Sequence, residues 1–226
     1  MIRTIMDIER KIFVLDDNEK ALVRQSGQTI RYPKGQLIFS AREYSSHVYL
    51  VESGWVKIFR LASDGRKLTV AIRHPGELVG IAETLCNSVR TCYGEAMDEV
   101  GLVVLKRDSF IDLLMANSQL SFRVAEALGG RLREAQAIIH EMVYWPVQGR
   151  LAQLLLKLAE RAGVDIGEGV ELNLRLTHEE IASMIGTSRP TVTSAFNAMK
   201  SEKAIVMEGR DIKIIFPKKL KKWLQQ

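Results

Sequence analysis

The feature that most constrains the fold of this 226-residue chain is a change of hydrophobic periodicity near Lys106. Before it, from about residue 28 to residue 105, short apolar or alternating runs such as 48–51 and 55–59 are separated by glycine-containing turns. The run Ser63-Asp64-Gly65-Arg66 between two such segments is typical of a β-hairpin. Many short strands in succession predict an antiparallel barrel or jelly roll.

After Lys106 the pattern becomes helical. A short helix is expected over 108–115 and one long helix over 119–144. Apolar residues on the long helix recur at spacings of 4, 3, 4 and 3, which is the seam of a two-stranded coiled coil. The seam consists of Leu128, Leu132, Ala135, Ile139 and Met142. It predicts a homodimer, and packing of the helix on its own barrel is the alternative.

Pro146 marks a hinge or the start of a new helix, because proline disfavours helical geometry in the preceding residue. An amphipathic helix is expected over 147–162, followed by a glycine-bearing loop over 163–169. The sequence therefore predicts an α+β chain in three parts. These are a β-roll effector or sensor domain at 1–117, a dimerisation helix and hinge at 118–146, and a C-terminal domain at 147–226.

The most specific segment is 176–200, which predicts two helices around a tight turn. Thr177 can cap the first helix, and Glu180 three residues later completes a capping box. Gly186 stands where the chain must turn sharply, and Thr187 or Ser188 can cap the second helix. The segment therefore predicts a helix-turn-helix whose second helix runs from about residue 188 to residue 200.

The second helix separates a core face from an open face. Pro190 falls in its first turn, where the missing N–H costs little. Val192, Phe196 and Met199 are spaced to face the core. The open side carries side chains of the types that contact bases and phosphates in the DNA major groove. The candidate DNA contacts are Thr177, His178, Ser188, Arg189, Pro190, Thr191, Thr193, Ser194, Asn197 and Lys200.

The segment 204–216 predicts two short strands around Glu208-Gly209-Arg210-Asp211. A hairpin that follows a helix-turn-helix makes a winged helix, and Arg210 and Lys213 favour a wing that contacts DNA over a hairpin that only packs. The charge of this region also favours DNA contact, because residues 147–226 hold 13 Lys or Arg against 9 Asp or Glu, and the net charge of the whole chain is +5. This excess favours a polyanionic partner.

Composition excludes several classes of protein. With 46% hydrophobic and 26% charged residues, no long apolar run and no signal peptide, the chain is expected to be cytoplasmic, with no membrane partner. Two cysteines give no disulfide framework and too few ligands for a structural metal site. A cupin-type enzyme would need clustered His and Glu ligands in the barrel, and the sequence does not supply them. A nucleophile-elbow or phosphate-loop motif is also missing, so we expect no catalytic residues.

The order of these parts resembles the Crp/Fnr family of bacterial regulators over nearly the whole chain. The resemblance is carried by the glycine-punctuated roll, the long helix ending in Pro146-Val-Gln-Gly-Arg-Leu-Ala152 and, most specifically, Gly186-Thr-Ser-Arg-Pro-Thr-Val192. It implies a cyclic-nucleotide-binding-like sensor domain whose ligand repositions two DNA-binding domains, with reciprocal coupling of ligand and operator affinity. It also implies double-stranded DNA with a palindromic operator, a second copy of the chain and RNA polymerase as partners.

The chain departs from the family at its base-reading positions. The positions where the best-known members carry a glutamate and an arginine are Pro190 and Ser194 here. Loss of two charge-assisted base contacts, each giving about 1–3 kcal/mol of discrimination, predicts a palindrome with a core other than TGTGA or TTGAT. Arg189 is the best candidate for a guanine contact, and Thr191, Thr193 and Asn197 are candidates for phosphate or adenine contacts.

The effector region departs as well. Cyclic-AMP-binding relatives have Gly-Glu followed later by Arg-Ser or Arg-Thr, whereas this chain keeps Arg90-Thr91 but follows Gly80 with Ile81. Glu83, on an expected strand, would share the face of Ile81. The family's adenine contacts on the dimer helix correspond to Ala135 and Gln136. The candidate effector contacts are Gly80, Glu83, Arg90, Thr91 and Gln136, and we expect a small molecule other than cyclic AMP. For Arg90, a surface ion pair is the alternative.

Other sensing chemistries are disfavoured. No cysteine precedes Cys86 to hold an iron–sulfur cluster, and Gly80-Ile81-Ala82 replaces the haem ligands of carbon-monoxide sensors, so neither cofactor is expected. Cys86 and Cys92 lie in an apolar stretch, where packing is the expected role and a thiol switch the alternative. A constitutive DNA-binding protein whose roll has lost its ligand remains a further alternative.

Overall fold

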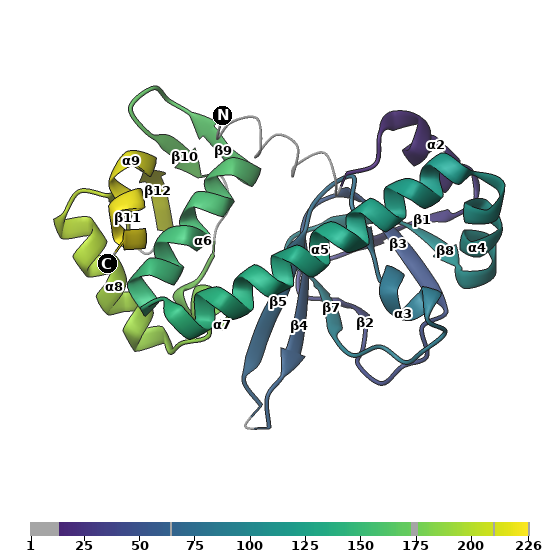
Figure 1. Cartoon of the computed structure of the whole chain (residues 1–226), viewed down its shortest axis with the longest axis horizontal. Helices are drawn as coiled ribbons and strands as arrows, with labels where there is room; N and C mark the ends of the chain where they lie inside the picture. Colours follow the sequence, from purple (N-terminus) through teal and green to yellow (C-terminus); the bar gives the residue numbers. More distant parts are fainter. Residues whose placement is uncertain (1–13, 64, 173–175, 210, 226) are drawn as a thin grey trace. The chain divides into compact units, whose positions relative to one another are not determined.

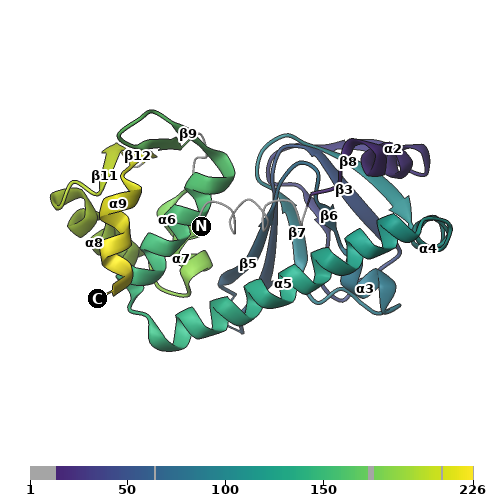
Figure 2. The same ribbon diagram turned by 45° about the horizontal axis from the view of Figure 1, so that its top comes forward.

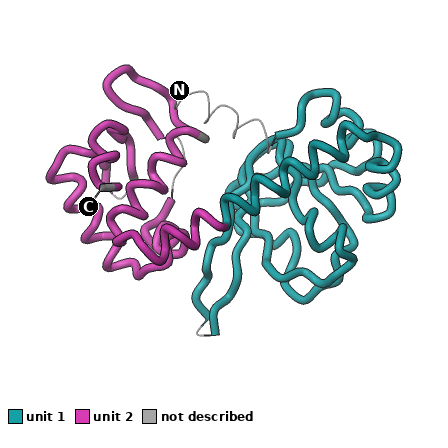
Figure 3. Tube along the Cα trace, viewed as in Figure 1, with its two compact units in different colours: residues 1–135 teal, residues 136–226 magenta. Residues whose placement is uncertain are grey.

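The structure is a computed structural model that describes residues 14–63, 65–172, 176–209 and 211–225 (Figure 1). The chain forms two compact units, residues 1–135 and 136–226 (Figure 3). The long helix α5 (Ser118–Tyr144) contributes its first part to one unit and its last part to the other. Among the described residues, no helix is both long enough and apolar enough to cross a membrane.

The first unit is a roll of two four-stranded antiparallel sheets. One sheet has the order β1-β8-β3-β6, and the other has the order β2-β7-β4-β5. The strands of the first sheet are β1 (Gln28–Tyr32), β8 (Val100–Lys106), β3 (His47–Ser53) and β6 (Leu78–Val79). Those of the second are β2 (Leu37–Phe39), β7 (Tyr93–Ala96), β4 (Val56–Leu61) and β5 (Lys67–Arg73). The predicted antiparallel roll is confirmed, although residue 64 at the tip of the predicted hairpin lies outside the described residues.

Apolar side chains from both sheets form the interior of the roll. Val51 and Leu102 from one sheet belong to the same buried cluster as Val56 and Ala96 from the other. A second cluster joins the other face of the first sheet to α2 (Asp17–Gln25), α4 (Arg107–Ala116) and the start of α5. Figure 2 shows α4 and the beginning of α5 beside this sheet. Burial of this kind gives about 25 cal/mol for each Å² of apolar surface removed from water, so the two clusters hold the roll together.

The segment after Gly80 is a helix, so the expected strand there is wrong. Gly80 has φ +78° and begins α3 (Ile81–Leu85), which buries Ile81 and Thr84. A left-handed residue cannot continue the strand that ends at Val79, and glycine adopts this conformation without steric cost. Glu83 therefore lies on a helix, about half a helical turn from Ile81, and does not share the face of Ile81 as it would on a strand.

The second unit is a helical domain with a small sheet. It begins with the predicted amphipathic helix α6 (Val147–Ala162), which buries Leu151, Leu155 and Leu158. The helix-turn-helix is α7 (His178–Ile185) and α8 (Arg189–Ser201), and the wing is β11 (Ile205–Glu208) and β12 (Asp211–Ile215). The long helix, the helix-turn-helix and the wing are thus confirmed.

Two features of this unit were not predicted. The expected loop at 163–169 is wrong in its first part, because β9 (Gly163–Asp165) and β10 (Val170–Leu172) extend the wing sheet in the order β11-β12-β10-β9. After the wing, α9 (Pro217–Leu220) and the 3₁₀ helix η1 (Lys221–Gln225) follow. Leu220 and Trp223 are buried, and Trp223 lies against Gly149 in the first turn of α6.

Candidate DNA-binding surface and effector region

Two capping interactions fix the ends of the helix-turn-helix. The Thr177 hydroxyl accepts from the Glu180 N–H at 3.2 Å, and the Glu180 carboxylate accepts from the Thr177 N–H at 2.8 Å. Gly186 ends α7 with φ +64° and ψ +49°, a left-handed conformation that other residues avoid. Ser188 then caps α8 by accepting from the Thr191 N–H. The predicted capping box and turn are present, and they set the angle between the two helices.

The helix α8 has one buried side and one open side, as its sequence predicts. Val192, Phe196 and Met199 are buried in the unit's core. The opposite side is exposed at Arg189, Pro190, Thr191, Ser194, Asn197 and Lys200. Apolar burial along one stripe holds the helix in place, while the polar stripe stays available to a partner.

The hydroxyl groups on α8 already have partners within the unit. The Thr193 hydroxyl donates to the Arg189 carbonyl at 3.0 Å and lies 2.9 Å from His178 Nδ1. The His178 ring also lies against the Phe196 ring, with 4.9 Å between centroids. The Ser194 hydroxyl donates to the Pro190 carbonyl at 3.2 Å. His178 and Thr193 therefore fasten α7 to α8.

Three long polar side chains remain available on the open stripe. In the part of the chain that the structure describes, no hydrogen bond or ion pair engages the side chains of Arg189, Asn197 or Lys200. Arg189 and Asn197 are eight residues apart, which is about 12 Å along a helix. These donors can meet an extended acceptor surface such as a DNA groove. Arg210, predicted to lie at the wing tip, falls outside the described residues, and Lys213 pairs with Glu208 at 3.3 Å.

Arg90 is buried in the roll, so the alternative of a surface ion pair is wrong. It is 3% exposed, and it donates from Nη1 to the Gly80 carbonyl at 2.8 Å and from Nη2 to the His47 carbonyl. Its guanidinium carbon lies 4.6 Å from the centroid of the Phe39 ring. Burial lowers the pKa of Arg90 below its ordinary value, because a charged group loses its hydration inside the roll. Any Cβ on Gly80 would lie 2.3 Å from Nη1, so the sequence needs glycine there.

Three of the other predicted effector residues, Gly80, Glu83 and Thr91, come together around this arginine. The Thr91 hydroxyl donates to Glu83 Oε1 at 3.0 Å, and Glu83 Oε2 lies 3.7 Å from Arg90 Nη1. Gln136, the fifth, belongs to the other compact unit. The guanidinium of Arg90 thus donates to two main-chain carbonyls of the roll itself.

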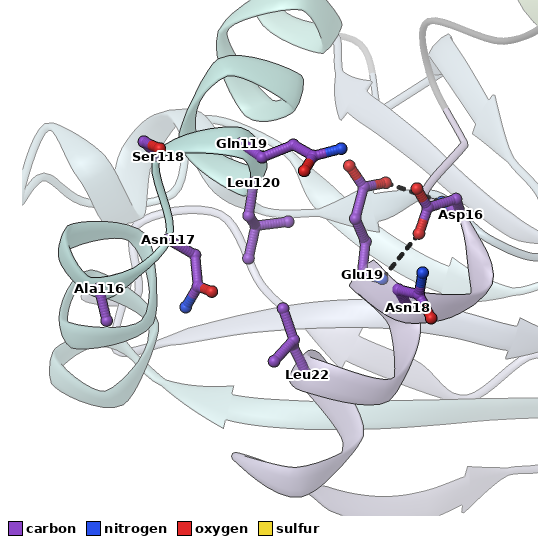
Figure 4. Close-up of a pocket in the computed structure, with 9 residues that line it drawn as sticks. All are labelled: Asp16, Asn18, Glu19, Leu22, Ala116, Asn117, Ser118, Gln119 and Leu120. Atoms are coloured by element: carbon purple, nitrogen blue, oxygen red, sulfur yellow. Dashed lines mark hydrogen bonds between the residues drawn. The ribbon is translucent and has the colours of Figure 1, made fainter.

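The structure also contains hollows that the sequence did not indicate. A cavity of about 260 Å³ lies at the start of α2 and at the α4–α5 junction, lined by Asp16, Asn18, Glu19, Leu22 and residues 116–120 (Figure 4). The Glu19 carboxylate there accepts from the Asp16 N–H at 2.7 Å and pairs with Arg123. A second hollow of about 390 Å³ is lined by Tyr44, Ser46, His47, Asn87, Lys106, Arg107 and Asp108. Neither gathers the predicted effector residues as a set.

The remaining predicted groups have simple surroundings. Leu132, Ile139 and Met142 are 61%, 65% and 38% exposed on α5, while Leu128 is half-buried and Ala135 is exposed. Among the described residues, no cluster of three or more His, Cys, Asp or Glu could hold a metal ion.

Cys86 follows the short helix α3 and is exposed at the surface. The expected packing role is therefore wrong for Cys86.

An antiparallel roll joined by a long helix to a winged helix-turn-helix defines a two-domain DNA-binding regulator. Comparison with known proteins gives the family. Residues 29–117 match the family model described as a cyclic nucleotide-binding domain, and residues 149–223 match the Crp-like helix-turn-helix domain. The chain belongs to the Crp/Fnr family of transcriptional regulators, and its relatives are regulators rather than enzymes.

Two curated relatives illustrate the similarity. The CRP-like cAMP-activated global transcriptional regulator of Mycobacterium tuberculosis is 31% identical over 194 residues, which is 86% of each chain. The cyclic AMP receptor protein of Thermus thermophilus is 31% identical over 171 residues, which is 76% of each chain.

Two solved structures share the fold. A CooA mutant from Carboxydothermus hydrogenoformans has a TM-score of 0.78 at 24% identity, covering 95% of this chain and 99% of its own. The c-di-GMP-responsive regulator CLP of Xanthomonas campestris has a TM-score of 0.76 at 19% identity, covering 89% of this chain and 99% of its own.

Proposed function

We propose that this chain is a homodimeric regulator that binds a palindromic operator and whose DNA affinity is controlled by a small molecule in the roll. The proposed domains are 1–117 for the effector, 118–146 for dimerisation and 147–226 for DNA. The observation that carries the proposal is the open stripe of α8. Its donors on Arg189, Asn197 and Lys200 have no partner among the described residues, while the opposite stripe is fully buried.

Dimerisation is supported by the seam on α5. Leu132 and Ile139 expose more than half of their surface, and contact with the same seam on a second copy would remove it from water. Two copies related by a two-fold axis present two recognition helices, which match the two halves of a palindrome. At promoters we expect RNA polymerase to be the further partner, and in vitro transcription would test that contact.

A constitutive regulator is the second candidate, and the hydrogen bonds of Arg90 favour it. The guanidinium bonds the Gly80 and His47 carbonyls, which is a structural role within the roll. Measuring operator affinity in the presence of a metabolite panel that includes cyclic AMP separates the candidates. A change of affinity with any compound supports effector control, whereas constant affinity supports the constitutive regulator.

The experiment that tests the proposed function is selection of bound sequences from random duplex DNA, followed by variants of α8. We expect a palindrome whose core differs from TGTGA. Arg189→Ala should lose discrimination at one base pair of each half-site, by about 1–3 kcal/mol. Lys200→Ala serves as the control, because loss of a phosphate contact weakens all sequences alike and lowers the salt dependence by about one counterion. If the selection enriches no sequence motif, sequence-specific DNA recognition by α8 is refuted.

A further inference from the structure

Arg150 on α6 joins the ends of two other helices. Its Nε donates to the carbonyl of Ile185, the last residue of α7, at 2.9 Å. Its Nη1 donates to the carbonyl of Trp145, directly after the end of α5, at 3.0 Å. The Trp145 N–H bonds the Glu141 carbonyl at 3.0 Å, so the helical hydrogen bonding continues up to this residue. One side chain therefore bridges α5, α6 and the turn of the helix-turn-helix.

The chemistry of this bridge suits an arginine. The last carbonyls of a helix have no partner within the helix, and they carry the partial negative charge of its dipole. A guanidinium presents several N–H groups in a rigid plane, so it can donate to two carbonyls at a fixed angle. A lysine presents a single point of charge and cannot fix the angle between two acceptors in the same way.

Two further contacts fasten the same corner. Lys157 Nζ on α6 lies 2.9 Å from Glu141 Oε1 on α5. The end of the Met142 side chain on α5 lies against Gly186, 3.0 Å from the position of any added Cβ. All these residues belong to the compact unit 136–226. The last turn of α5 is thus attached to the helix-turn-helix within one compact unit.

We infer that Arg150 is a positioning residue that fixes the direction of α8 relative to the end of the dimerisation helix. In this role it sets the half-site spacing that the dimer accepts. The inference rests on the proposed function. In a two-fold dimer the attachment occurs twice, so its angle determines the separation of the two recognition helices. Half-sites of such dimers lie about 34–36 Å apart, and one added base pair also rotates one half-site by about one tenth of a turn. If the attachment is rigid, the dimer loses affinity for an operator with the altered spacing, whereas a flexible attachment lets the dimer bind both spacings.

The test measures binding to three DNA duplexes that carry the selected operator, the operator with one base pair inserted between half-sites and the operator with one removed. A single half-site is the fourth probe. For the wild-type chain we expect a clear preference for the natural spacing. For Arg150→Ala we expect this preference to fall at least tenfold, because the variant loses both charge-assisted hydrogen bonds and one such bond alone corresponds to about that factor. Affinity for the single half-site should stay within about twofold, because α8 itself is unchanged.

Control variants separate positioning from folding. Lys157→Ala removes the neighbouring ion pair but frees no helix carbonyl, so it should keep most of the spacing preference. Arg150→Lys keeps the charge without the planar fork, so the preference should be intermediate. If Arg150→Ala does not fold, as judged by circular dichroism, the comparison of Arg150→Lys with the wild-type chain decides.

Three outcomes have distinct meanings. An unchanged spacing preference in Arg150→Ala, or in Arg150→Lys where that variant decides, refutes the inference and leaves the proposed function intact. A loss of affinity that is equal on all four probes assigns Arg150 a merely structural role and also refutes the inference. A wild-type chain that binds none of the probes refutes the proposed function, and the inference with it.

Discussion

Gly186 provides a quantitative test of how the turn between α7 and α8 is built. Its backbone is left-handed, with φ +64° and ψ +49°, which costs an L-residue about 1–2 kcal/mol relative to glycine. An added Cβ would also lie 3.0 Å from Met142 Cε, the flexible end of a methionine side chain, which can move by a few tenths of an ångström. Gly186→Ala should therefore destabilise the C-terminal unit by about 1–2 kcal/mol, nearly all of it from the backbone.

Gly209 provides the matched control. Its φ is +61°, and no heavy atom lies within 4 Å of an added Cβ, so Gly209→Ala carries the backbone cost alone. The difference between the two alanine variants measures the Met142 contact, which we expect to contribute less than about 1 kcal/mol. Gly186→Asn should recover part of the loss, because asparagine tolerates the left-handed region better than alanine.

The assay is urea unfolding at fixed protein concentration in a Trp55→Phe background, where Trp145 and Trp223 report on the C-terminal unit. A lower midpoint at unchanged slope measures the loss of stability. If Gly186→Ala proves neutral or stabilising, the left-handed turn does not limit the sequence and the backbone argument fails. If its loss exceeds that of Gly209→Ala by several kcal/mol, Met142 is held rigidly.

Three further predictions address the other elements. Leu132→Lys should convert the proposed dimer to monomers in sedimentation experiments, because it places two charges in the seam. Phe122→Lys, exposed but outside the 4-3 spacing, should leave the proposed dimer intact. Burial and then the positive charge of Arg90 lower the pKa of His47, so its NMR titration midpoint should lie below 6.5. As the pH falls through 6.5, His47 therefore takes up a proton in the unfolded chain before it does so in the folded chain. The free energy of unfolding of the roll should decrease from pH 6.5 down to the pKa of the folded state, and this decrease should be smaller in His47→Gln. Thr177→Ala removes an N-cap and should cost about 1 kcal/mol in urea unfolding; no measurable change would show that the capping box does not stabilise α7.

The helix-turn-helix was predictable because its signals are local. The cap at Thr177, the left-handed Gly186 and the proline in the first turn of α8 each act on backbone groups only a few residues away. The helix α2, which was not predicted from the sequence, has a comparable local signal in the capping box of Asp16 and Glu19. The strands β9 and β10 had no such signal, since β9 pairs with β10, and β10 in turn pairs with β12 some forty residues later.

The role of Arg90 could not be predicted from the sequence for a different reason. The pair Arg90-Thr91 resembles a phosphate-binding motif, but the sequence does not say whether the guanidinium faces a ligand or the protein. That depends on Gly80, which lets the backbone approach the guanidinium closely, and on the Phe39 ring that lies against it. These residues are separated from Arg90 by 10 and 51 positions, so only the folded chain brings them together.

The same geometry sets a condition on any effector that acts through Arg90. Its two hydrogen bonds to the Gly80 and His47 carbonyls involve a charged donor, and together such bonds contribute about 3–6 kcal/mol. An anion that takes the guanidinium must offset that loss before it binds with any net affinity. The carbonyls that it releases belong to the start of α3 and to β3, so binding would loosen these two elements of the roll. An effector that acts through Arg90 therefore has to couple its own binding to a rearrangement of the roll, and an anion without enough compensating contacts will leave these two hydrogen bonds in place.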